Sequence, residues 1–254
     1  MTPEKGIKSK ITIRIKIGGD GTFNFQPSTR NSYTPRVTVL GYIVLVLCAY
    51  LLGSIPTGYL VARAKGIDIR TVGSGNIGAT NAFRVLGKPA GVFVLLVDGL
   101  KGYAACIWLT SFLISVFGLH PDNLVTERAF AGFAAILGHS FTCWLHFKGG
   151  KGIATSAGVY FAVALPAAAI ALGSWIILFV LTRYVSLASI VAAVALSAGV
   201  WATFGTHQSV ALGLASTALG AMVIWKHRSN IARLKAGTEN RISFGKKRLD
   251  GGKA

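Results

Sequence analysis

The sequence predicts an all-α, polytopic integral membrane protein with about seven transmembrane helices and glycine-rich loops on its cytoplasmic side. Hydrophobic residues make up 52% of the 254 residues and charged residues only 13%, about half the charged fraction of soluble domains. The apolar residues form several uncharged runs of about 18 residues or more, as a helix across a bilayer requires. These runs recur as far as the C-terminal tail, which excludes a secretory signal peptide as their explanation.

Six apolar segments follow a polar N-terminal region. One of them, residues 153–181, carries no charge and is too long for a single helix across a ~30 Å hydrocarbon core unless it is strongly tilted. Pro166 and Gly173 are expected to break it into a span and a shorter helix, which gives seven helices, or five to six if the middle ones merge. The other segments are expected at residues 37–62, 90–118, 128–147, 186–204 and 208–225.

Two polar tails flank the predicted membrane domain, residues 37–242. Residues 1–36 are basic and are expected to be disordered, because residues 11–17 alternate like a strand that has no partner. Residues 243–254 form a short C-terminal tail.

The net charge of +18 would suggest nucleic acid in a soluble protein, but here lipid headgroups explain it better. With seven spans, residues 63–88, 148–151, Arg183 and the C-terminal tail fall on one side, and the opposite loops hold only Arg128. The positive-inside rule makes the basic side cytoplasmic. The N-terminal tail, with seven Lys and Arg, disagrees, since an odd number of spans places it outside.

A glycine-rich polar segment, residues 73–84, follows the first span and reads GSGNIGATNAFR. Its glycines let the backbone approach a ligand closely, and successive N–H groups can form an anion nest. A plain interfacial loop is the alternative, but such loops seldom hold this many hydrogen-bonding side chains. Arg84 adds a fork suited to phosphate oxygens. The candidate binding residues are Ser74, Asn76, Thr80, Asn81 and Arg84.

Asp98 and Lys101 lie inside the second apolar segment. Residues three apart on a helix face each other, so the two can simply neutralise one another. Ionisable groups at membrane depth are costly and usually mark a functional site. Both interpretations are expected to hold, with Asp98 as an orienting group and Lys101 near the site.

A lysine- and glycine-rich turn follows the third span, and His139 precedes it. Two lysines, three glycines and the start of a helix can cradle a phosphate, although the spacing of a Walker A loop is absent. His139 is a catalytic candidate together with Asp98 and Lys101, although a lone interfacial histidine is more often structural. The candidate binding residues of the turn and the helix start are Lys148, Gly149, Gly150, Lys151, Gly152 and Thr155.

A basic segment, HRSNIARL at residues 227–234, follows the last span. Anchoring on anionic lipid explains its cations well. It does not explain His227 and Asn230, which lie three apart on one helical face and are therefore expected to contact the ligand.

The chain resembles the acyl-phosphate:glycerol-3-phosphate acyltransferases (the PlsY family) over residues 40–242. The resemblance rests on four segments in the family's order and spacing: GSGNIGATNAFR, DGLKG, GHSF with FKGGKGIATSAG, and HRSNIARL. Any one of them alone is a weak signal, but together they are highly specific. Thr142 departs from the family pattern, which usually has proline there, and residues 1–36 have no counterpart.

The resemblance implies a multi-pass enzyme of the bacterial inner membrane whose active site faces the cytoplasm. It would transfer a fatty acyl chain from acyl phosphate to the 1-hydroxyl of glycerol 3-phosphate, the first acylation step of phospholipid biosynthesis. The products would be lysophosphatidic acid and phosphate. The implied partners are glycerol 3-phosphate, acyl phosphate, membrane lipid and the soluble enzyme that makes acyl phosphate, with no cofactor, metal or nucleic acid.

The residues favour direct transfer, because the clusters supply cations and backbone N–H groups but no nucleophile–base–carboxylate triad. The base could be His139, His227 or a phosphate oxygen of the substrate. A transporter for a phosphorylated solute is the competing class. Transporters often carry internal repeats and midplane polar residues, whereas this sequence shows no convincing repeat and its polar clusters gather at one interface.

Overall fold

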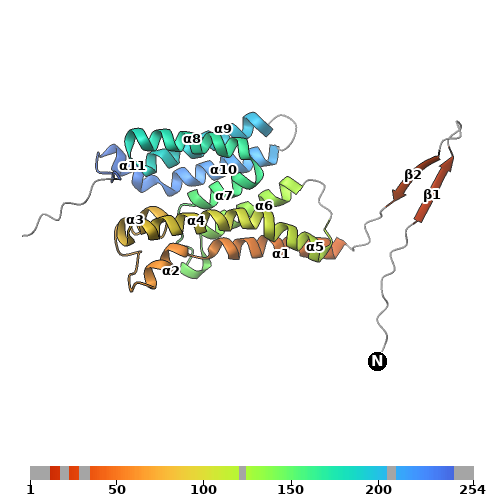
Figure 1. Ribbon diagram of the computed structural model, residues 1–254, viewed down its shortest axis with the longest axis horizontal. Helices are drawn as coiled ribbons and strands as arrows, with labels where there is room; N and C mark the ends of the chain where they lie inside the picture. Colours follow the sequence, from red (N-terminus) through yellow and green to blue (C-terminus); the bar gives the residue numbers. More distant parts are fainter. Residues whose placement is uncertain (1–11, 18–22, 29–34, 120–123, 205–209, 243–254) are drawn as a thin grey trace, which may run out of the picture.

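The computed structural model describes residues 12–17, 23–28, 35–119, 124–204 and 210–242 of the chain (Figure 1). From residue 35 onward, the described part contains helices and their connecting turns. The predicted all-α membrane architecture is therefore confirmed for this region.

A small antiparallel hairpin, β1 (Thr12–Ile17) and β2 (Phe23–Ser28), precedes the helices. The expectation that residues 11–17 have no partner strand was wrong. A second alternating segment, FNFQ at residues 23–26, supplies the partner, with Ile15 opposite Phe25. The rest of the predicted N-terminal tail lies outside the described residues.

Helices α1 (Pro35–Ser54) and α2 (Thr57–Arg63) are interrupted at Pro56, whose ring cannot continue a helix. The glycine-rich loop leads to α3 (Ala79–Leu86). Gly87, at φ +93°, then turns the chain into α4, a backbone conformation that favours glycine. Three segments run on without a gap: α4 (Lys88–Ala104), the π-helical turn η1 (Ala105–Leu109) and α5 (Thr110–Phe117).

The middle of the chain forms α6 (Leu124–Ser140), the 3-10 turn η2 (Cys143–Leu145), α7 (Ile153–Val163) and α8 (Leu165–Thr182). The predicted break near Pro166 is confirmed, because α7 ends at Val163 and α8 begins at Leu165, with the proline in its first turn. The predicted break at Gly173 was wrong: it lies inside α8. A glycine only weakens a helix, by ~1 kcal/mol, whereas proline removes a hydrogen bond and clashes.

The last part comprises α9 (Val185–Phe204), α10 (Val210–Lys226) and the short α11 (Arg228–Lys235). Among the described residues, four segments are long and apolar enough to cross a membrane. Helices α10 and α11 are bent by 56° relative to each other, and if this pair counts as one span, the number of candidate spans rises to five. The count of seven is not confirmed, since α7 has only 11 residues. The four segments are residues 37–63, 88–117, 165–182 and 185–203.

Close helix contacts depend on small residues, as is usual between membrane helices. A Cβ added at Gly53 of α1 would lie 2.0 Å from the carbonyl oxygen of Ala135 in α6. A Cβ at Gly158 of α7 would lie 1.9 Å from the carbonyl oxygen of Gly99 in α4. The two pairs hold α1 against α6 and α4 against α7, and so bring the polar clusters of different helices together.

Figure 1 shows α2, α3 and α11 gathered at one end of the helical bundle, where α8 also ends. The first helix, α1, begins at the opposite end. The predicted polar clusters therefore converge on one end of the membrane domain.

Candidate active site

A cavity of about 530 Å³ opens between the helices and has two unlike parts. Its polar part contains cations, carboxylates, amides, hydroxyls and imidazoles from the loops and from α3, α4, α6, α7, α9 and α11. Its apolar part runs between α7, α8, α9 and α10. The polar lining includes Ser74, Asn76, Thr80, Asn81, Arg84, Asp98, His139, Lys151, Gly152, Ser156, Ser186, His227, Asn230 and Glu239.

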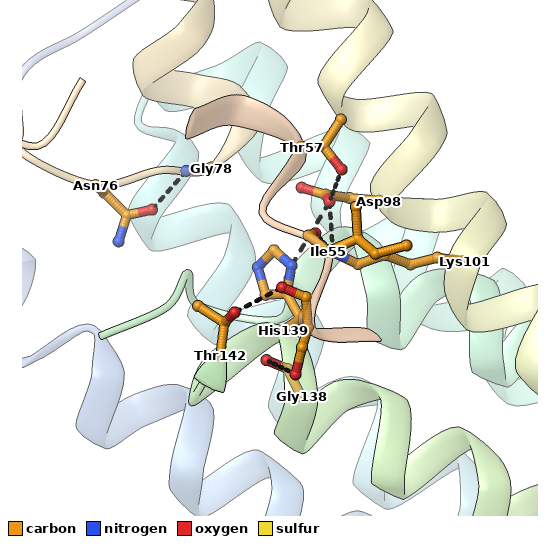
Figure 2. A network of polar contacts seen from close by, with 10 residues as sticks. Ile55, Thr57, Asn76, Gly78, Asp98, Lys101, Gly138, His139 and Thr142 are labelled. Carbon is orange, nitrogen blue, oxygen red and sulfur yellow. Dashed lines mark hydrogen bonds and ion pairs between the residues drawn. The ribbon is translucent and has the colours of Figure 1, made fainter. Parts of the chain in front are cut away.

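Asn81 organises the glycine-rich loop. Its side-chain amide donates to the carbonyl oxygens of Ile69 (3.2 Å) and Val72 (3.1 Å), and its Oδ1 accepts from the N–H of Ser74 at 2.8 Å. The residue is only 1% exposed. Asn81 thus shapes the loop rather than offering its amide to a ligand. Asn76 similarly accepts from the N–H of Gly78 at 2.9 Å, just before α3 begins (Figure 2).

Asp98 is the centre of a buried cluster (Figure 2). Its Oδ1 accepts from the hydroxyl of Thr57 at 3.0 Å and pairs with the Nζ of Lys101 at 2.8 Å. The Nδ1 of His139 lies 3.6 Å from the same oxygen, slightly beyond hydrogen-bond range. Lys101 also donates to the carbonyl oxygen of Ile55 at 2.9 Å. Asp98 and His139 line the cavity, whereas Lys101 lies behind them and acts as a positioning group.

The lysine-rich loop lies against the end of α6. The N–H of Gly150 donates to the carbonyl oxygen of His139 at 3.0 Å. A Cβ at Gly149 would lie 2.1 Å from that oxygen, and one at Gly150 would lie 2.2 Å from Nε2 of His139. Both glycines are therefore required for packing on the histidine. Only Lys151 and Gly152 of this loop line the cavity, while Lys148 is exposed.

A chain of buried polar contacts joins this loop to the C-terminal segment. Lys151 donates to Oδ1 of Asn230, whose amide donates to Oε1 of Glu239 at 2.7 Å. The same carboxylate accepts from Ser186 at 3.0 Å and from Arg233 at 2.7 Å. Glu239 thus ties α9 and α11 to the lysine loop.

His227 begins the bend between α10 and α11 and is 2% exposed. Its Nδ1 lies 2.8 Å from the carbonyl oxygen of Val223. Because a carbonyl oxygen only accepts, Nδ1 carries the hydrogen, and Nε2 of the neutral ring is left as an acceptor. An acceptor at the wall of the cavity suits the hydroxyl of a substrate.

The pKa of Lys151 is lowered to about 8, chiefly because the side chain is buried. The charge of Glu239 raises this pKa, and the charges of Arg233 and Arg84 lower it further. Burial raises the pKa of Glu239, but hydrogen bonds from Asn230, Arg233 and Ser186 outweigh this effect, so its pKa is lowered. At neutral pH, three cations thus surround one carboxylate in the polar part. A dianionic ligand would be attracted by the excess positive charge.

The structure brings most of the predicted binding residues to one cavity, including both members of the pair His227 and Asn230. Besides Asn81, which shapes its own loop, it corrects the roles of four others. Lys148 is exposed, Gly149 and Gly150 pack on His139, and Thr155 is fully buried against Gly102 of α4. The predicted site residues did not include three groups that hold the site together: Thr57, Ser186 and Glu239. Among the described residues, no cluster of His, Cys, Asp and Glu is arranged to bind a metal ion.

Comparisons with known proteins agree on one family. Residues 43–237 match the family model described as glycerol-3-phosphate acyltransferase. The glycerol-3-phosphate acyltransferase of Geotalea daltonii is 46% identical, over 78% of this chain and 96% of the relative. That of a Synechococcus strain is 47% identical, over 80% of this chain and 96% of the relative.

Two solved structures are similar to this chain. One is a crystal structure of PlsY, an integral membrane glycerol 3-phosphate acyltransferase, in its glycerol 3-phosphate form. It is 41% identical, with a TM-score of 0.69, over 80% of this chain and 96% of that chain. The other is the lysophosphatidic acid form, 40% identical with a TM-score of 0.67, over 80% of this chain and 95% of that chain.

Proposed function

The chain belongs to the glycerol-3-phosphate acyltransferase family, and on that premise we propose that acyl phosphate is its acyl donor. The acyl group is transferred to the 1-hydroxyl of sn-glycerol 3-phosphate, which yields lysophosphatidic acid and inorganic phosphate. This reaction is the first acylation step of phospholipid biosynthesis. As an enzyme of this family, the protein is not a transporter, the competing interpretation of the sequence.

One observation carries the proposal: a single cavity joins a cationic polar part to an apolar groove between four helices. Arg84 and Lys151 line the polar part, where they can bind phosphoryl oxygens. The apolar groove suits a fatty acyl chain. Substrate headgroup and acyl chain then meet where the two parts of the cavity join, which makes the transfer effectively intramolecular.

The reaction needs positioning more than covalent catalysis, because phosphate is already a good leaving group. The glycerol hydroxyl oxygen forms a bond to the acyl carbonyl carbon, and the bond from that carbon to the phosphate oxygen breaks. The hydroxyl proton passes to a base, and the bonding electrons leave with phosphate. Three bases fit: His227 through its Nε2, His139 beside Asp98, and an oxygen of the substrate phosphate.

The donor is tested with purified protein and radiolabelled glycerol 3-phosphate. Labelled lysophosphatidic acid should form with acyl phosphate and not with acyl-CoA or acyl carrier protein. Comparable turnover with either thioester would reject acyl phosphate as the specific donor. If acyl phosphate is the donor, a soluble enzyme that produces acyl phosphate supplies it in the cell.

The site is proposed to face the cytoplasm of a bacterial inner membrane. The support is the basic character of the segments that gather at the end of the bundle bearing α2, α3 and α11 (Figure 1), as the positive-inside rule requires. A cysteine placed at exposed Lys148 should react with a membrane-impermeant thiol reagent in inverted vesicles but not in intact spheroplasts. The reverse pattern would place the site on the other side.

A further inference from the structure

The end of helix α6, which carries His139, is bound by several distant parts of the chain. The last four carbonyl oxygens of an α-helix have no partner within the helix, and on α6 they belong to residues 137–140. Each of these oxygens accepts a hydrogen bond from outside the helix. In chain order of the acceptors, the donors are the N–H of Phe141 (2.7 Å), the hydroxyl of Ser54 (3.3 Å), the N–H of Gly150 (3.0 Å) and the ammonium of Lys226 (2.7 Å).

Lys226 is the charged member of this set. Its Nζ also lies 4.0 Å from the centroid of the Phe141 ring, within the range of a cation–π contact. The helix dipole further favours a cation at the C-terminal end of a helix. Anchoring on anionic lipid, which explains exposed cations near a membrane, does not explain an ammonium that is bound to the end of another helix.

The bond between Lys226 and α6 joins two parts of the cavity wall. Lys226 is the last residue of α10 and directly precedes His227. Its acceptor, Ser140, directly follows His139 on α6. Both histidines line the cavity, whereas Lys226 does not. A shift of α10 relative to α6 would break the bond and move one imidazole relative to the other.

We propose that Lys226 is a positioning residue that acts through His227, because it holds the bend between α10 and α11 in place against the end of α6. The inference rests on the proposed function, since it takes both histidines as part of the acyl-transfer site. Arg84 and Lys151, the cations proposed to bind phosphate, stand on other segments of the chain. Loss of Lys226 should therefore lower kcat and leave the KM for glycerol 3-phosphate nearly unchanged.

The test measures kcat and KM of purified wild-type, Lys226→Met and Lys226→Arg protein with acyl phosphate as the donor. Methionine keeps the apolar stem and removes the ammonium, whereas arginine restores a cationic donor. We expect kcat to fall about tenfold in Lys226→Met, which corresponds to ~1.4 kcal/mol, and to recover largely in Lys226→Arg. If the methionine variant does not fold, Lys226→Gln gives the same comparison with a shorter, neutral side chain.

Arg228→Met is the matched control for a lipid-binding cation. Arg228 is exposed, and its guanidinium lies 4.6 Å from the centroid of the Trp225 ring, so kcat should fall only slightly. Wild-type and Lys226→Met protein are also compared in nanodiscs of pure phosphatidylcholine, where the difference in kcat should persist. Its disappearance there, or an equal loss in Arg228→Met, would mean that Lys226 only binds anionic lipid and would overturn the inference.

A double-mutant cycle with His227→Ala shows whether Lys226 acts through that imidazole. In the His227→Ala background, Lys226→Met should lower kcat little further. Independent losses that multiply, an unchanged kcat in Lys226→Met, or a raised KM alone would overturn the inference while leaving the proposed reaction intact. Absence of transfer from acyl phosphate by the wild type would instead overturn the proposed function, and the inference with it.

Discussion

Replacing Glu239 by glutamine removes one negative charge from the network that positions Lys151 and Asn230. The Glu239 side chain is only 2% exposed, and its carboxylate accepts from Ser186, Asn230 and Arg233. Glutamine has the same shape, but its amide nitrogen cannot accept a hydrogen bond. One of the two carboxylate oxygens is therefore lost as an acceptor, and a charged partner becomes a neutral one.

The expected loss of activity in Glu239→Gln follows from the hydrogen bonds that the carboxylate accepts. Bonds to a charged group contribute ~1.5–3 kcal/mol, and the Asn230 bond is buried, so it is expected to lie within this range. The Arg233 side chain is 36% exposed, so solvent screening reduces its share. We therefore expect kcat/KM for glycerol 3-phosphate to fall by about one to two decades in Glu239→Gln. Ser186→Ala, which leaves the charge and two donors in place, should lose only a few-fold.

The pH dependence provides a second readout that simple unfolding would not imitate. Lys151 must be charged to bind phosphate, so activity should fall as the pH rises through its pKa of about 8. The charge of Glu239 raises that pKa, so its removal should move the alkaline limb of the profile to lower pH. Steady-state kinetics across the alkaline range measures both effects. Wild-type kcat/KM and an unshifted limb in a folded Glu239→Gln variant would refute this role of the network.

Three further outcomes are expected from transfer assays on purified variants. Arg84→Ala should nearly abolish transfer by raising KM for glycerol 3-phosphate. Lys148→Ala should lower activity only slightly, because Lys148 is exposed and does not line the cavity. Equal losses of activity in the two variants would contradict this distinction. His227→Ala should lower the rate of transfer by roughly one to two decades, and Arg228→Ala should lower it much less. Wild-type activity of the His227→Ala variant would mean that residues 227–234 serve only as a lipid anchor. Deletion of residues 1–34 should leave activity largely unchanged, since α1 begins at the end of the bundle opposite the site (Figure 1). Loss of activity in a correctly inserted truncation would contradict this expectation.

Local patterns in the sequence predicted most of the fold and much of the site. Uncharged apolar runs predicted the helices, and Pro166 predicted the break before α8 because its effect on a helix is local. The pair His227 and Asn230 was found from helical spacing alone, and both residues line the cavity.

Local patterns could not predict contacts between segments that are far apart in the sequence. Ser186 and Glu239 are 53 residues apart, and neither stands in a glycine-rich cluster. Thr57 reaches Asp98 across 41 residues from a helix start that composition alone does not single out. Gly149 and Gly150 were read as a phosphate cradle, because the sequence does not reveal that the loop folds back onto His139.

The most direct test of the central claim is a structure of the protein with glycerol 3-phosphate and a non-transferable acyl phosphonate bound together. The account predicts glycerol phosphate oxygens beside Arg84 and Lys151, with the acyl chain in the groove between α7, α8, α9 and α10. Binding of the headgroup elsewhere, or of the acyl chain outside this groove, would contradict the claim that one cavity serves both substrates.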